Sequence, residues 1–147
     1  METQFYNDNR NFFKKLLFHN DHVIRTRAVC VLAEIGGEDA VRPISIVLER
    51  DEDELVRHEA AFSLGQLGLT TGISSLSKAL ENDKSIFVRH EAAIALGIIG
   101  SEEGRKILNN SLNGVTKVKK SAIVALANLD YISRTRKINK FTRMTEG

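Results

Sequence analysis

The sequence has no tryptophan, a single proline and a single cysteine, and aromatic residues make up only 6% of its 147 residues. One cysteine, Cys30, excludes a disulfide within the chain and gives no sign of an oxidising compartment. Scarce proline and aromatics, together with frequent alanine and leucine, favour helices packed by aliphatic side chains. No apolar run approaches the roughly 20 residues of a membrane-spanning helix, and the first residues lack the order of a secretory signal. We therefore expect a soluble, cytoplasmic protein without a membrane partner.

The charges of the chain are nearly balanced. There are 21 basic and 19 acidic residues, which gives a formal net charge of +2. This balance does not favour nucleic acid as a partner of the whole domain. The exception is a basic tail, residues 132–147, which contains five arginines and lysines but only one glutamate. Such a tail is suited to an acidic partner or to nucleic acid, although solvated chain ends commonly have this composition.

An internal repeat organises the rest of the chain. The segments VIRTRAVCVLAEIG, LVRHEAAFSLGQLG and FVRHEAAIALGIIG begin at residues 23, 55 and 87, a constant spacing of 32 residues, and a weaker copy, KVKKSAIVALANLD, begins at residue 117. In every copy apolar residues recur in steps of four, four and three, which trace one face of a helix. The second of these positions is always alanine, which lets neighbouring helices approach closely. Each copy is therefore predicted to be one helix of a repeating hairpin.

The partner helices of these hairpins are predicted from shorter apolar-periodic segments at approximately residues 6–18, 41–49, 72–80 and 103–112. Pro43 falls near the start of the second segment, where a missing N–H costs least. Glycines close the helices and aspartates precede several of them, namely Gly36, Gly37, Gly68, Gly100, Asp21, Asp53 and Asp83. The predicted fold is all-α, a right-handed α-α superhelix of about four HEAT-like hairpins, in one domain over residues 1–131.

The two middle repeats carry a His-Glu pair at the same register, His58-Glu59 and His90-Glu91. Equal register in a solenoid places these pairs side by side on one wall, about 200° around the helix from the core stripe. Helix axes about 8–10 Å apart allow two imidazoles to share one ion. With a carboxylate they make the two-histidine, one-carboxylate set of non-haem iron sites. The alternative is that both histidines are solvated surface residues copied by repeat duplication.

Two further register positions recur. Gly65 and Gly97 stand seven residues beyond each histidine on the same face, which suggests room in front of the pair, although Leu-Gly is also a generic feature of such repeats. Basic residues hold another position in all four repeats, where we expect them to pair with acids or carbonyls between hairpins: Arg25, Arg57, Arg89 and Lys119. Cys30 aligns with apolar residues of the other repeats and is predicted to be a small buried hydrophobe.

The repeats over residues 21–130 resemble the short HEAT-like repeats of phycobilin lyases. The tandem LVRHEAAFSLGQLG and FVRHEAAIALGIIG resemble more closely the His-Glu repeats of the deoxyhypusine hydroxylase family. That resemblance implies a di-iron monooxygenase in which His58, His90 and Glu91 ligate one iron and Glu59 helps to hold the substrate. The family has two lobes with four such motifs, whereas this chain has one lobe with two.

The missing lobe leads to a prediction about assembly. A homodimer with two-fold symmetry would bring two identical walls together, with one iron per chain and two per dimer. The resemblance implies a protein substrate, a hypusine-type translation factor. Two other functions stay open: a non-catalytic scaffold that binds a protein on its concave face, and a lyase-like or chaperone-like role.

Overall fold

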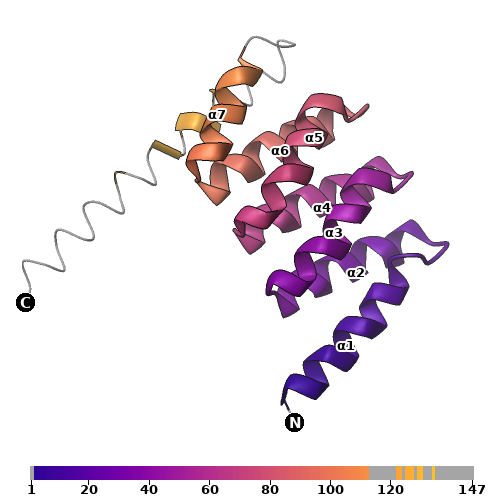
Figure 1. The fold of residues 1–147 in the computed structure, drawn as a ribbon. Coiled ribbons are helices and arrows are strands. Elements are labelled where there is room, and N and C mark those ends of the chain that lie inside the picture. Colours follow the sequence, from indigo (N-terminus) through magenta and orange to yellow (C-terminus); the bar gives the residue numbers. More distant parts are fainter. Residues whose placement is uncertain (1, 113–121, 124, 128, 131–133, 135–147) are drawn as a thin grey trace, which may run out of the picture.

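The computed structural model describes residues 2–112, 122, 123, 125–127, 129, 130 and 134. Within these residues the chain forms α-helices and one 3₁₀ turn: α1 (Glu2–Leu16), α2 (His22–Ile35), α3 (Glu38–Arg50), α4 (Glu54–Leu67), η1 (Thr70–Gly72), α5 (Ile73–Asn82), α6 (Ile86–Ile99) and α7 (Glu102–Ser111). Figure 1 shows the helices stacked as successive hairpins along one direction. The predicted all-α repeat solenoid is confirmed.

Local chemistry fixes where the helices of the hairpins begin and end. The Asp21 carboxylate accepts a hydrogen bond from the backbone N–H of Val23 at 2.8 Å, and Asp53 caps α4 in the same way through Leu55. At the other ends, Gly36, Gly68 and Gly100 have φ of 76°, 66° and 71°, backbone angles that favour glycine. The caps predicted at Asp21 and Asp53 and the stops at these glycines are therefore confirmed, whereas Asp83 precedes α6 without capping it, since the N-cap of α6 is Ser85.

The predicted start of the second partner helix was wrong. The sequence pattern placed it near Val41, but α3 begins at Glu38, immediately after the glycine pair that closes α2. Glu38 and Asp39 in the first turn favour this earlier start because their charges complement the helix dipole. Pro43 consequently lies in the second turn, where it withholds a hydrogen bond from the carbonyl of Asp39. Asp39 is exposed, so water can replace that bond.

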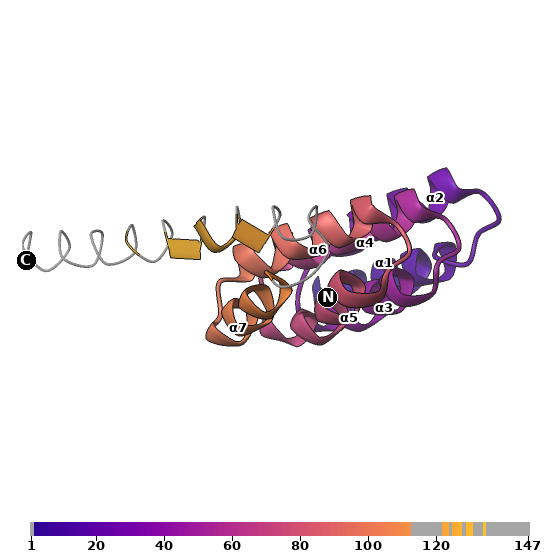
Figure 2. The same cartoon turned by 90° about the horizontal axis from the view of Figure 1, so that it is seen from above.

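The helices form two layers, and Figure 2 shows α2, α4 and α6 side by side in one of them and α3, α5 and α7 in the other. The repeated alanines at the predicted close-packing position are fully buried, and so are the apolar residues that follow them by four: Ala28, Ala60, Ala92, Leu32, Leu64 and Leu96. Ala122, the corresponding alanine of the fourth repeat, is buried as well. The core thus runs between the layers as one continuous aliphatic strip.

Buried arginines join successive hairpins, as predicted. Arg25 pairs with Asp51 at 2.9 Å and donates to the carbonyl oxygens of His19 and Asn20. One repeat later, Arg57 pairs with Asp83 at 2.9 Å, and the side chains of both residues are less than 10% exposed. Each arginine lies in the helix of one hairpin and each aspartate follows the first helix of the next. We call these contacts the arginine ladder.

The arginine ladder changes at its third step. Arg89 donates to the carbonyl oxygen of Asp83 at 2.7 Å, but its Nε is buried without a hydrogen-bond partner among the described residues. Asp51 and Asp83 lie six residues before the basic residue of the following repeat, and the equivalent residue Asn113 lies outside the described part of the chain. The equivalent residue Lys119 lies outside the described part of the chain.

The fourth hairpin is described only in part. Its second predicted helix includes helical residues at Ala122, Ile123, 125–127, Leu129 and Asp130, and Asp130 pairs with Arg105 of α7 at 2.7 Å. The predicted tail, residues 132–147, lies outside the described residues except for Arg134, and so does the predicted boundary at residue 131. Among the described helices, none combines the length and apolarity that crossing a bilayer requires.

Candidate metal centre

The two His-Glu pairs lie on neighbouring helices of the same layer. Capping by Asp53 places His58 and Glu59 in the second turn of α4, and the start of α6 at Ile86 gives His90 and Glu91 the equivalent positions. Helices α4 and α6 pack closely along their length. The predicted juxtaposition of the two motifs on one wall is therefore present.

His58 and Glu91 meet across this helix pair. The distance from His58 Nε2 to Glu91 Oε2 is 3.1 Å, with the imidazole 39% exposed and the carboxylate 11% exposed. Two ligand atoms that each lie about 2.1 Å from one ion, with a right angle between the two bonds, would be about 3 Å apart. The spacing therefore fits two ligands of one ion, and it equally fits a proton shared by the pair.

The third predicted ligand is placed differently. His90 is exposed on the same wall, one residue before Glu91, and it already takes part in a noncovalent interaction. Within the described residues, no group of three or more His, Cys, Asp or Glu side chains is close enough to hold a metal ion. The assignment of His58, His90 and Glu91 to one iron stays a prediction, and of these three residues His58 and Glu91 are in contact.

Glu59 points to the other neighbouring helix. Its Oε1 accepts a hydrogen bond from the Sγ of Cys30 in α2 at 3.2 Å. Cys30 was predicted to be a buried hydrophobe, but it is half-buried and has this polar partner. Desolvation by burial, followed by the hydrogen bond to Glu59, raises the pKa of the Cys30 thiol to about 11. The thiol is therefore held protonated beside the carboxylate predicted to hold the substrate.

This environment makes a prediction about thiol chemistry. Because the pKa of Cys30 rises from 9.0 to about 11, the thiolate fraction near pH 8 falls about a hundredfold, and alkylation by iodoacetamide should slow in proportion. Glu59→Gln, which removes the negative charge beside the thiol, should restore part of the rate. The rate in urea-unfolded protein provides the reference. Equal alkylation rates for folded and unfolded chains would contradict the raised pKa of the Cys30 thiol.

The glycines beyond the histidines do not serve the purpose predicted for them. A Cβ on Gly65 would lie 2.9 Å from the Cβ of Ala95 in α6, and a Cβ on Gly97 would lie 2.8 Å from the carbonyl oxygen of Ala125. These distances are shorter than ordinary packing allows. Each glycine therefore lets its helix approach the next one, and neither opens space in front of the His-Glu pair.

The remaining histidines lie apart from this wall contact, as predicted. His19 is in the turn after α1, where its Nδ1 accepts a hydrogen bond from the backbone N–H of Asp21 at 3.0 Å. His22 is exposed at the first position of α2. Neither residue is at the register of His58, so both can serve as comparison positions in metal-binding experiments.

Comparisons with known proteins agree with this architecture. The family pattern for HEAT repeats matches residues 41–127, more than half of the chain. No curated protein sequence matches the chain. Among solved structures, human deoxyhypusine hydroxylase in complex with glycerol is similar, with a TM-score of 0.83 and 28% sequence identity. The match covers 91% of this chain and 48% of that one, so the chain spans about half of the hydroxylase.

A second solved structure shows likeness of fold alone. The complex of CpcE and CpcF of phycocyanin lyase from Nostoc sp. PCC7120 aligns with a TM-score of 0.64 and 20% sequence identity. That alignment covers 82% of this chain and 64% of the lyase chain. Both resemblances predicted from the repeats are thus found among solved structures.

Proposed function

The chain belongs to the HEAT-repeat family, and from that premise we propose that it is an iron-binding lobe of a deoxyhypusine-hydroxylase-like monooxygenase, completed by a second copy of the same chain. The observation that carries the proposal is the contact of His58 with Glu91 at 3.1 Å between adjacent helices. Two ligands per chain leave positions for others. His90 of the same chain, or the wall of a second copy, would provide them.

Each chain's residues have distinct parts in this proposal. His58, His90 and Glu91 hold the iron, which supplies oxygen activation when bound. Glu59 lies beside them on the wall and presents a carboxylate that can orient a cationic amine on a protein substrate. Its hydrogen bond from Cys30 limits the rotation of that carboxylate. The coverage of about half of the similar hydroxylase is the reason for proposing two copies.

Metal content tests the proposal directly. Protein purified and then reconstituted with Fe(II) should hold about one iron per chain, measured by elemental analysis after gel filtration. His58→Ala and Glu91→Gln should each abolish retention without unfolding the chain, as judged by circular dichroism. His22→Ala, which removes an exposed histidine from a different register, is the matched control. Wild-type protein that takes up no iron, or equal loss in His22→Ala, would contradict the proposal.

The same wall also carries exposed apolar side chains, which favours the scaffold as a second candidate. Leu55 and Phe87 are 63% and 67% exposed at equivalent positions of α4 and α6, and Phe62 and Ile98 extend the apolar surface. Exposed apolar patches mark surfaces that bind other proteins. In the enzyme proposal the second copy covers this surface, whereas in the scaffold proposal a different protein does. A dimer mass in solution supports the first, and a monomer without iron supports the second.

A further inference from the structure

A groove of ≈ 500 Å³ lies in the layer that contains α3, between the end of α1 and one face of α3. Five apolar side chains line it: Leu17, Phe18, Pro43, Ile46 and Val47. A volume of several hundred cubic ångströms is within the range of sites that bind ligands. None of the residues of the candidate metal centre lines this groove, so it is a separate surface.

The groove exists because α1 diverges from its neighbour. Helices α3 and α5 pack against each other, and so do α5 and α7, whereas α1 contacts mainly α2. The apolar side chains between α1 and α3 therefore lack the helix that would cover them. Phe18 is 83% exposed and Ile46 is 38% exposed. These two side chains therefore present apolar surface that an apolar partner can bury.

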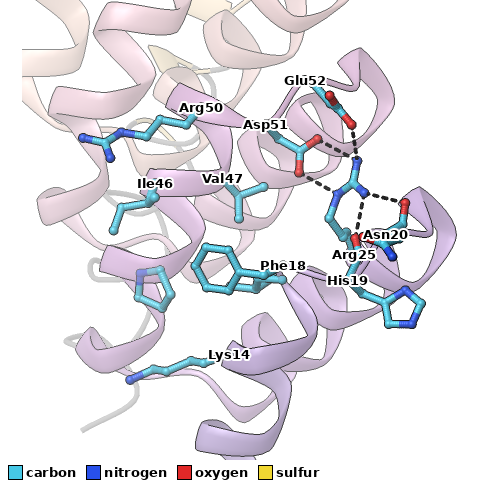
Figure 3. Close-up of a pocket in the computed structure, with 12 residues that line it drawn as sticks. Lys14, Phe18, His19, Asn20, Arg25, Ile46, Val47, Arg50, Asp51 and Glu52 are labelled. Carbon is cyan, nitrogen blue, oxygen red and sulfur yellow. Dashed lines mark hydrogen bonds and ion pairs between the residues drawn. The ribbon is translucent and has the colours of Figure 1, made fainter.

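Two cations stand on opposite sides of these apolar groups. Figure 3 shows Lys14 and Arg50 beyond Phe18 and Ile46 on either side, with both side chains reaching outwards. Neither cation has a hydrogen bond or ion pair with any residue in the described part of the chain. Arg25, a third cation at the groove, is already held by Asp51. Lys14 and Arg50 are thus available to an incoming anionic group.

We propose that this groove binds a peptide segment of a partner protein in which bulky apolar side chains are flanked on both sides by acidic residues. The apolar side chains cover Phe18 and Ile46, and the acidic residues pair with Lys14 and Arg50. The separation of the two cations favours this chemistry over a molecule with one anionic headgroup, because a single headgroup reaches only one side. Lys14 and Arg50 also lie in the last turns of their helices, where their charges complement the helix dipoles.

A defined peptide tests the proposal on the full chain. The probe is a fluorescein-labelled peptide of about twelve residues, with leucine and phenylalanine at its centre and glutamates on each side. Fluorescence anisotropy should show saturable binding that weakens as salt rises. Charge reversal by Lys14→Glu with Arg50→Glu should weaken binding by about tenfold or more. Phe18→Ser should weaken it independently of salt.

The controls separate the groove from general attraction of charge. Lys15→Glu with Arg42→Glu changes the same helices by the same charge at exposed positions outside the groove, and it should leave binding unchanged. Lys14→Gln with Arg50→Gln provides a milder test should the reversal pair fail to fold. Equal weakening by both reversal pairs would overturn the proposal. So would equal binding of a peptide with lysines in place of the glutamates, or saturable binding of dodecanoate when the peptide does not bind.

Discussion

Replacing Arg57 with alanine is expected to lower the free energy of unfolding by about 3–5 kcal/mol, because it leaves the Asp83 carboxylate buried without its countercharge. Arg57 Nε and Nη2 donate to the two oxygens of Asp83 at 2.9 and 3.1 Å, and Nη1 donates to the carbonyl oxygen of Asp51. Truncation therefore removes a bidentate ion pair and a backbone contact together. Urea unfolding followed by circular dichroism measures the loss.

A double-mutant cycle separates the ion pair from simple loss of packing. Asp83→Ala should also destabilise, and Arg57→Ala with Asp83→Ala should cost less than the two single losses added together, because neither charge is then left unpaired. Arg42→Ala, which removes an exposed arginine from α3, should change stability by less than about 0.5 kcal/mol. Additive losses in the cycle would show that the two side chains do not act as a pair.

Replacing Gly65 with alanine is expected to lower the free energy of unfolding by about 1–3 kcal/mol through overpacking. The direction is opposite to the usual effect, since alanine within a helix is favoured over glycine by about 1 kcal/mol. The added Cβ would meet the Cβ and Cα of Ala95 at 2.9 and 3.0 Å. Helices α4 and α6 would have to move apart, and the contact between His58 and Glu91 would lengthen with them.

Removing the opposing methyl group tests this cause. In an Ala95→Gly background the Gly65→Ala substitution should lose part of its cost, because the Cβ of Ala95 has been deleted while its Cα remains. Thermal unfolding of the four chains, wild type, both single variants and the double variant, gives the comparison. A gain in stability for Gly65→Ala in the wild-type chain would show that the helices are not in close contact at this point. Iron retention by the same variants would show whether the contact between His58 and Glu91 depends on the distance between α4 and α6.

The repeat pattern was sufficient to predict the helices because several signals agreed. The 32-residue spacing, the buried alanines and the Asp21 and Asp53 caps all specified the same hairpins. The pattern did not predict the first residues of the helices, because apolar periodicity does not define where a helix begins. Helix α1 begins at Glu2 and not near Tyr6, and α3 begins at Glu38 because glycines and acids, not apolar residues, determine its first turn.

The candidate site was predictable only to the level of shared register. Alignment places His58 beside His90, but contacts between adjacent helices are offset along their axes. His58 meets Glu91, 33 residues ahead, and Cys30 meets Glu59, 29 residues ahead, whereas the repeat is 32. Those offsets depend on helix rotation and crossing, which the sequence does not contain. The groove beside α1 was missed for the same reason, since it depends on the direction in which α1 leaves the stack.

The arginine ladder couples the first three hairpins to one another. Arg25 binds the two oxygens of Asp51 at 2.9 and 3.2 Å, and Arg57 binds those of Asp83 at 2.9 and 3.1 Å. A stack of this kind behaves as a chain of nearest-neighbour couplings, and the weakest coupling opens first. The contact between His58 and Glu91 starts from the same helix α4 as the pair of Arg57 with Asp83, so opening of that joint would separate the two side chains of the candidate metal centre.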